Sequence, residues 1–176
     1  MKKLKRRSIR LSHWDYSNAG WYFVTICVEG MRCELGTVKN NKVELSEYGN
    51  IVEKFWISLI KRYEDISLDE YVIMPNHFHG ILAINNYVGA IHELPVRSEK
   101  KIHRKMLLPK IIGFFKMNSA KEINSSRHTQ GRPFWHRNYY EHIIRNEKDL
   151  QRICEYIIEN PYKWKADKYY PDKFDK

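Results

Sequence analysis

The chain has 176 residues, a length that suits one domain with a buried core and no disulfide staples. Its 31 Lys and Arg residues outnumber 21 Asp and Glu residues, and the formal net charge of +10 favours polyanionic partners, with nucleic acid ahead of a membrane surface. The sequence has no apolar run long enough for a membrane span, no hydrophobic segment after the basic N-terminus and only three cysteines, which disfavours a secreted or membrane protein.

The first third of the chain predicts a strand, a hairpin and a helix. Residues 21–28 are rich in β-branched and aromatic side chains and follow a turn signal, which is typical of a strand. Residues 34–45 predict a short hairpin closed by two asparagines. Ser46 then has the position of a helix N-cap, and apolar residues at helical spacing carry the predicted helix to Lys61.

A pair of histidines marks a second predicted hairpin. Residues 66–74 predict a strand, the Pro-Asn dipeptide at 75–76 suits the centre of a type I turn, and residues 77–84 predict the returning strand. Because side chains alternate along a strand, His77 and His79 should project from one face while the phenylalanine between them points to the other. Two adjacent imidazoles on a rigid strand supply half of a metal site.

The second half of the chain predicts two helices separated by a short β region. A helix is expected from about 108 to 123, and one or two short strands follow within 134–144. Asn146 should cap a final helix that runs from 147 to about 160 and ends before a proline.

One domain accounts for all these elements. Their order predicts an α+β sandwich, in which helices pack on an antiparallel sheet. The sequence shows neither repeats nor a second domain. The expected organisation is a single domain over 1–176, with a basic N-terminal arm at 1–16, a mobile loop at 85–105 and a C-terminal tail at 165–176.

Tyr156 and Asn160 lie together on one flank of the apolar stripe of the final helix, because residues four positions apart are neighbours on a helix surface. Facing a sheet that carries His77 and His79, they would place a nucleophile beside a third metal ligand. Such a metal keeps open positions for the oxygens of a phosphodiester. Tyrosine suits the nucleophile because a phosphotyrosyl ester stays reactive enough for later rejoining without an external energy source.

The His-Phe-His sequence at 77–79 matches the His-hydrophobe-His (HUH) signature, and the blocks at 134–146 and 155–161 resemble the single-tyrosine HUH transposases. The resemblance is strongest to the REP-associated tyrosine transposases, relatives of the small insertion-sequence transposases, and covers roughly 17–164. It implies a ferredoxin-like fold, a single-stranded DNA substrate that often includes a hairpin, and a divalent metal.

The resemblance also implies a mechanism and its residues. The matching tyrosine attacks DNA and becomes linked to its 5′ phosphate, which leaves a free 3′ hydroxyl. By motif position the nucleophile is Tyr156 and the metal ligands are His77, His79 and Asn160. Imidazole ligation favours Mn²⁺, with Mg²⁺ as the other candidate. We therefore expect a metal-dependent nickase and strand transferase, a monomer or a homodimer, in the cytoplasm of a prokaryotic cell and associated with its nucleoid.

The candidate DNA-binding residues are cations near the site, cations of the arm and one tryptophan: Arg137, Arg145, Lys5, Arg6, Arg7 and Trp135. The two arginines near the site are expected to contact phosphates. The arm cations are less specific, since a solvated surface explains them equally well. The tryptophan is a candidate for stacking on an unpaired base.

Some alternatives stay open at this point. Tyr139, Tyr140 and Tyr162 compete with Tyr156 for the role of nucleophile. A catalytically silent DNA-hairpin-binding protein and an HUH replication-initiator or relaxase-type nuclease are the alternative functions. The intact trio of two histidines and a tyrosine favours an enzyme over a binder, and the small size of the chain disfavours an initiator or relaxase.

Overall fold

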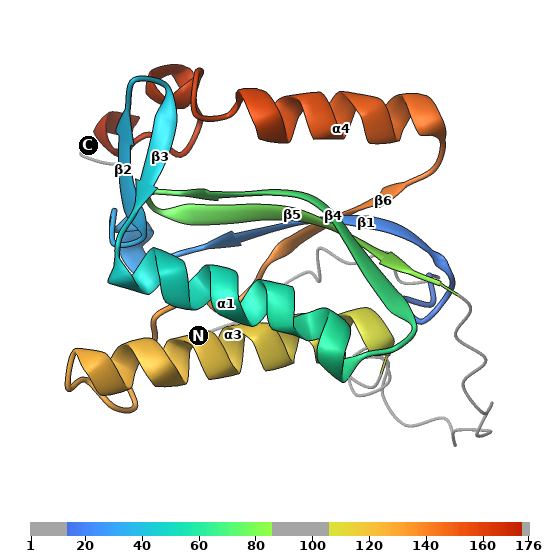
Figure 1. The fold of residues 1–176 in the computed structure, drawn as a ribbon, viewed down its shortest axis with the longest axis horizontal. Helices are drawn as coiled ribbons and strands as arrows, with labels where there is room; N and C mark the ends of the chain where they lie inside the picture. Colours follow the sequence, from blue (N-terminus) through green and yellow to red (C-terminus); the bar gives the residue numbers. More distant parts are fainter. Residues whose placement is uncertain (1–13, 86–105, 174–176) are drawn as a thin grey trace, which may run out of the picture.

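A computed structural model describes residues 14–85 and 106–173 of the chain (Figure 1). Lys5, Arg6 and Arg7, and all of the predicted 85–105 loop except Asn85, lie outside these residues. The elements are, in chain order, β1 (Gly20–Cys27), β2 (Gly36–Lys39), β3 (Lys42–Leu45), α1 (Glu47–Arg62), β4 (Ile66–Met74), β5 (His77–Ile84), α3 (Leu107–Ser126), β6 (Tyr140–Ile144) and α4 (Glu147–Glu159).

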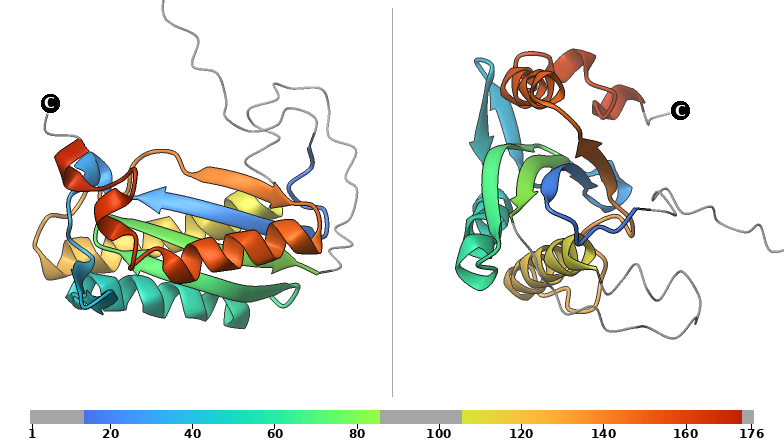
Figure 2. Two further views of the ribbon diagram at one scale, coloured as in Figure 1. Left: turned by 90° about the horizontal axis from the view of Figure 1, so that it is seen from above. Right: turned by 90° about the vertical axis from the view of Figure 1, so that its right-hand side faces the viewer.

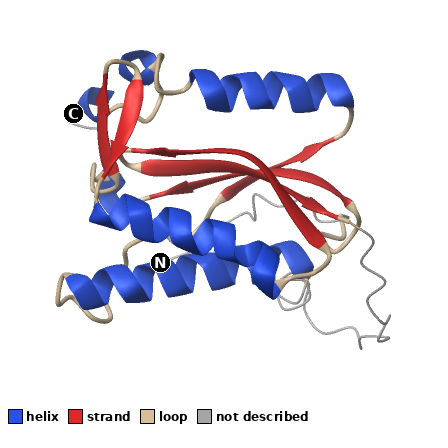
Figure 3. Cartoon of the chain, viewed as in Figure 1, coloured by secondary structure: helices blue, strands red, loops and turns tan. Residues whose placement is uncertain are grey.

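The main sheet has four strands in the order β4-β5-β1-β6, and every neighbouring pair is antiparallel. With α1 and α3 as the two connecting helices, this is the strand order of a ferredoxin-like fold. Figures 1 and 3 show α1 and α3 on one face of the sheet and α4 on the other, and the end-on view in Figure 2 separates the same layers. The predicted α+β sandwich is confirmed.

The β4–β5 hairpin forms where the sequence predicts it. Met74 pairs with His77 across a two-residue turn, so the histidine pair begins directly at the tip of the hairpin. The alternation of faces also holds, because Phe78 is fully buried among the helices on the opposite face. Its ring centroid lies 4.6 Å from that of Trp56 on α1 and 5.3 Å from that of Phe115 on α3.

Gly80 allows this packing because it has no side chain. A Cβ built at this position would lie 2.6 Å from the ring of Phe78 and 2.7 Å from the ring of Trp56. Both rings are fully buried and cannot move away cheaply. Glycine is therefore required at position 80, directly after the second histidine, because a side chain there would clash with two buried aromatic rings.

Helix α4 covers the other face of the sheet through a second, smaller apolar cluster. Ile153 and Ile157 of the helix pack with Phe23, Ile81 and Ile144 of the sheet. The helix begins as predicted, since the side chain of its N-cap residue, Asn146, accepts a hydrogen bond from the N–H three residues later at 2.9 Å.

The described residues of the predicted arm and tail contact the rest of the fold. Tyr16, within the predicted arm, is buried in the core. Two 3-10 turns, Trp164–Ala166 and Pro171–Lys173, form part of the predicted tail. The carbonyl of Tyr169 accepts a hydrogen bond from the Asn76 side chain at 2.7 Å, so this segment folds back on the tip of the β4–β5 hairpin. Within the described ranges no helix is long and apolar enough to cross a membrane.

Candidate active site

Strand register places a polar group of side chains at one end of the α4-facing surface. Cys27 of β1 is paired with His77 of β5, and Thr25 is paired with His79. The next pair on the same face joins Phe23 to Ile81, which belong to the apolar cluster under α4. Along β1 and β5, the side chains on this face are therefore apolar where α4 packs and polar at the tip of the hairpin.

Hydrogen bonds determine which nitrogen of His77 is free. Asn76 donates both of its amide hydrogen bonds to carbonyls, of Met31 at 3.2 Å and of Tyr169 at 2.7 Å, so its side-chain oxygen must accept. That oxygen lies 2.8 Å from Nδ1 of His77, which is therefore the protonated nitrogen. Nε2 of His77 then carries a lone pair, and it is buried without a hydrogen-bond partner among the described residues.

His79 is oriented in the same way by the neighbouring strand. Its Nδ1 lies 2.8 Å from Oγ1 of Thr25, and Nε2 lies 3.2 Å from the hydroxyl of Tyr156. In the tautomer with the proton on Nδ1, His79 donates to Thr25 and its Nε2 accepts from the tyrosine hydroxyl. In this tautomer both histidines present an unprotonated Nε2, and their ring centroids are 4.5 Å apart.

Burial keeps both imidazoles neutral. It lowers the pKa of His77 to about 3, with a further contribution from the positive charge of Lys168. It also lowers the pKa of His79 well below its usual value, and His77 and Lys168 act in the same direction. A neutral imidazole is the form that binds a metal ion, so the pair is held in the ligating state at neutral pH.

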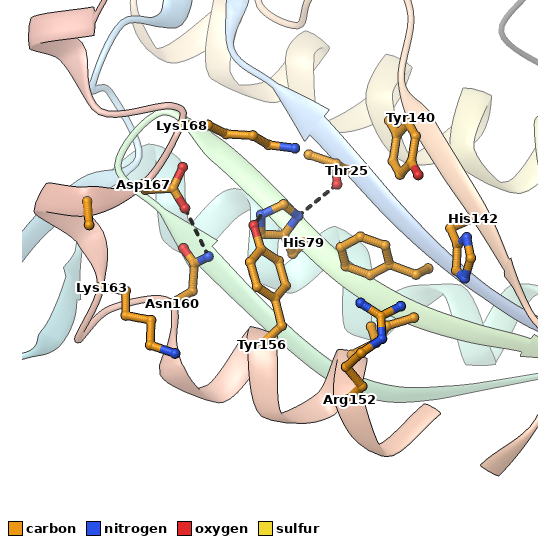
Figure 4. Close-up of a pocket in the computed structure, with 13 residues that line it drawn as sticks. Thr25, His79, Tyr140, His142, Arg152, Tyr156, Asn160, Lys163, Asp167 and Lys168 are labelled. Atoms are coloured by element: carbon orange, nitrogen blue, oxygen red, sulfur yellow. Dashed lines mark hydrogen bonds between the residues drawn. The ribbon is translucent and has the colours of Figure 1, made fainter. Parts of the chain in front are cut away.

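Tyr156 reaches from α4 to His79 in the same chain (Figure 4). Its ring centroid lies 5.2 Å from that of His79, and the edge-on ring of Phe23 is at 6.1 Å. Burial raises the pKa of Tyr156 to about 12, the charge of Asp167 adds to that rise, and the amide of Asn160 opposes it. The hydroxyl is thus protonated at neutral pH, and ionising it needs a nearby positive charge.

Asn160 sits one helical turn beyond Tyr156 and presents an amide oxygen with no partner. Its nitrogen donates to Asp167 at 3.1 Å, while its oxygen is buried without a hydrogen bond in the described part of the chain. The described residues contain no group of three His, Cys, Asp or Glu side chains suited to a metal. Unpaired lone pairs on His77 and Asn160, beside the acceptor nitrogen of His79, nevertheless fit a divalent ion held by two imidazoles and one amide.

A cavity of about 470 Å³ opens beside Tyr156. Its lining includes His79 and Asn160, but not the fully buried His77. The cations that line it are Arg152, Lys163 and Lys168, and the exposed ring of Tyr140 forms part of its rim. Positive side chains and an exposed aromatic ring suit a single-stranded nucleic acid.

The predicted DNA-binding residues that the structure describes, Arg137, Arg145 and Trp135, do not line this cavity. Arg137 and Arg145 are exposed, but neither lines it. The prediction for Trp135 is wrong: its indole is 5% exposed, and its N–H donates to Ser119 at 2.9 Å. The ring packs against Phe115 and Phe134 and cannot stack on a base.

The competing tyrosines differ from Tyr156 in their burial or in their contacts with the cavity and the histidines. Tyr139 is buried away from the cavity, Tyr162 is exposed and does not line it, and Tyr140 lines it without a ring contact to either imidazole. A further tyrosine that the sequence interpretation missed, Tyr169, has its ring centroid 4.6 Å from that of His77. Burial raises its pKa, and Cys27 contributes to that rise.

Other residues of the site were also missed. Thr25 gives no local signal because its role depends on which residue of another strand it faces. Asp167 and Lys168 lie in the predicted tail, where the sequence has no strong helical or strand pattern. Asn76 was assigned to the turn alone, although a residue adjacent to a ligand histidine is a reasonable place to look for its hydrogen-bond partner.

The chain is similar to known proteins in sequence and in fold. No protein-family model matches the chain. An uncharacterized protein of Haemophilus influenzae is 37% identical over 169 residues, which covers 95% of this chain and 94% of that protein. A second Haemophilus influenzae protein, named "Putative REP-associated tyrosine transposase", is 26% identical over 155 residues, which covers 85% of this chain and 74% of that protein. The solved structure of a REP-associated tyrosine transposase bound to a REP hairpin superimposes with a TM-score of 0.53 at 18% identity, over 96% of this chain and 77% of that chain, and supports the fold.

Proposed function

This chain belongs to the same family as the uncharacterized Haemophilus influenzae protein and resembles the REP-associated tyrosine transposases in sequence and fold, and from that premise we propose that it cleaves and rejoins single-stranded DNA. The observation that carries the proposal is the contact between the Tyr156 hydroxyl and Nε2 of His79 at 3.2 Å, next to the unpartnered Nε2 of His77. The proposed tyrosine nucleophile and the proposed two-histidine ligand set thus lie together within one chain.

The reaction transfers a phosphoryl group from the DNA to the protein. The hydroxyl oxygen of Tyr156 attacks phosphorus and forms a phosphotyrosyl bond, while the bond from phosphorus to the 3′ oxygen breaks. The tyrosine proton passes to water, and the departing 3′ oxygen takes up a proton to become a free hydroxyl. Attack of a 3′ hydroxyl on the phosphotyrosyl ester reverses these steps and releases the tyrosine.

A divalent ion would be held by Nε2 of His77, Nε2 of His79 and the amide oxygen of Asn160, with Mn²⁺ favoured over Mg²⁺. Such an ion polarises the phosphodiester and supplies the positive charge that a tyrosine with a raised pKa needs in order to ionise. The chain's own residues position the reactants. Thr25 and Asn76 fix the two imidazoles, and the apolar contacts of α4 hold the tyrosine against them.

The substrate we propose is DNA with an unpaired stretch next to a hairpin. The cavity beside Tyr156 is open and lined by cations, and the ring of Tyr140 is 50% exposed at its rim. An unpaired strand can present its bases to such a ring, whereas the bases of a duplex are stacked on each other. The solved REP-associated tyrosine transposase is bound to a REP hairpin, which supports a hairpin as part of the substrate.

Labelled DNA tests both the reaction and its polarity. The protein is incubated with hairpin oligonucleotides drawn from palindromes that flank its gene, in Mn²⁺ or Mg²⁺. A 3′-labelled strand should become covalently attached to the protein, whereas a 5′-labelled strand should be released as a shorter product with a free 3′ hydroxyl. Label transfer from the 5′-labelled strand instead would contradict the proposed polarity.

Two matched variants identify the nucleophile. Tyr156→Phe should abolish the adduct, and Tyr169→Phe, which removes the hydroxyl of the other tyrosine beside the histidines, should retain it. The opposite pattern would transfer the role to Tyr169. Hairpin binding without any adduct, in either metal, would show a DNA-binding protein without nuclease activity.

A further inference from the structure

Three cations line the cavity beside Tyr156, and two of them are already neutralised. Nη2 of Arg152 lies 2.6 Å from a carboxylate oxygen of Asp149, and Lys163 forms an ion pair with Glu159. Lys168 has no ion pair with any residue in 14–85 or 106–173. It is therefore the lining cation whose charge is available to an anion that enters the cavity.

The backbone around Lys168 is anchored to the site on both sides. On one side, Asp167 accepts hydrogen bonds from Asn160 at 3.1 Å and from the N–H of Tyr169 at 2.7 Å. On the other, the carbonyl of Tyr169 accepts from Asn76, the residue that orients His77. The ammonium nitrogen also lies 4.7 Å from the centroid of the Tyr169 ring, a distance that permits a cation–π contact.

The Lys168 side chain points toward the strand residues of the site. Figure 4 shows Lys168 extending from the C-terminal segment toward Thr25 and His79, on the side of the site opposite α4. Tyr156 approaches the same imidazole from α4. The charge of Lys168 lowers the pKa of His77, His79 and Cys27, in agreement with a position close to all three.

We infer that Lys168 is a catalytic residue, whose ammonium group binds a non-bridging oxygen of the phosphodiester attacked by Tyr156. The inference rests on the proposed function and adds a residue to it. Negative charge on the phosphoryl oxygens is concentrated during the displacement, and a cation already in place stabilises it without reorganisation. The phosphate in turn supplies the anion that Lys168 lacks in the DNA-free protein.

This assignment predicts opposite effects on metal binding and on chemistry. Without DNA, the ammonium group repels a divalent ion bound by the neighbouring histidines. With DNA, it assists the reaction. Removing the charge should therefore increase the affinity for Mn²⁺ several-fold in the DNA-free protein, yet slow formation of the adduct. A lysine needed only for folding would produce no such combination.

The experiment compares Lys168→Ala, Lys168→Arg and Lys54→Ala in the full chain. Lys54 of α1 is the control, because it is paired with Glu122 on the face of the sheet opposite α4 and does not line the cavity. Adduct formation is followed in single turnovers with the 3′-labelled hairpin, hairpin affinity by fluorescence anisotropy without metal, and Mn²⁺ affinity by calorimetry without DNA. Melting temperatures establish that each variant is folded.

Lys168→Ala should lower the rate of adduct formation about 100-fold while hairpin affinity falls only about threefold, as for the loss of one phosphate contact. Lys168→Arg should recover most of the rate, and Lys54→Ala should remain close to the wild type. A wild-type rate in Lys168→Ala would overturn the inference, as would a loss of rate no larger than the loss of hairpin affinity. Weaker Mn²⁺ binding in Lys168→Ala would contradict the position of the charge. No adduct from the wild-type protein is a different result, because it refutes the proposed function itself.

Discussion

Acid should destabilise the metal-free protein through its buried histidines. His77 has a pKa of about 3 in the folded protein, against about 6.5 in an unfolded chain. Below pH 6.5 the unfolded state takes up a proton that the folded state does not bind, so the free energy of unfolding falls as the pH decreases. For this one group the fall between pH 7 and pH 5 is about 2 kcal/mol. His79, whose pKa is also lowered by burial, contributes in the same direction.

Guanidinium unfolding of the protein in EDTA, at pH 7, 6 and 5 and at constant ionic strength, measures this loss. The fluorescence of the fully buried Trp56 reports on the core. His77→Gln should remove about 2 kcal/mol of the change between pH 7 and pH 5, whereas the same substitution at the exposed His136 should leave the change intact. Asp149, whose pKa is about 2 because of hydrogen bonds from His142 and Arg152, titrates below this range. If the free energy of unfolding fell by the same amount between pH 7 and pH 5 in the wild type and in His77→Gln, His77 would not be the source of the loss.

Three further predictions concern the ligand set, the core and the cavity. Asn160→Ala should weaken Mn²⁺ binding about tenfold or more in calorimetry, and Asn160→Asp should strengthen it, because a carboxylate is the better ligand for Mn²⁺; equal affinities would remove the amide from the ligand set. Gly80→Ala should destabilise the fold by about 1–3 kcal/mol in denaturant unfolding, since the added methyl group would lie 2.6 Å from the ring of Phe78, and a neutral result would mean that the core yields there. Tyr140→Ala should reduce affinity for an unpaired strand by about 1–3 kcal/mol in anisotropy measurements while Tyr140→Phe retains it; a duplex affected to the same extent would rule out base stacking.

Local patterns in the sequence accounted for the elements that carry the proposed chemistry. The two-residue alternation of a strand was enough to place His77 and His79 on one face and Phe78 on the other. The helical repeat was enough to place Tyr156 and Asn160 on the same flank of α4, one turn apart. Such relations follow from the covalent spacing of residues along a single element, so they hold whatever the element packs against.

The failed and missing predictions all depended on contacts between distant parts of the chain. Composition made Trp135 a candidate for base stacking, but its burial is decided by α3, where Ser119 accepts its N–H. The sequence interpretation assigned 165–176 to a C-terminal tail, yet Asn76 donates to the backbone of this segment and Asn160 donates to its Asp167 side chain. A side chain's exposure cannot be derived from its own type when a segment far away in sequence covers it.

Local patterns thus predict the content of each half of the site: two imidazoles on a hairpin, and a phenol with an amide on a helix. The halves meet through tertiary contacts, with 3.2 Å between the Tyr156 hydroxyl and Nε2 of His79. Tertiary contacts also bring Thr25 to His79 and Lys168 to the same cavity. Strand register, sheet order and the docking of α4 are set by hydrogen bonds and apolar packing between segments dozens of residues apart, and no local periodicity encodes them.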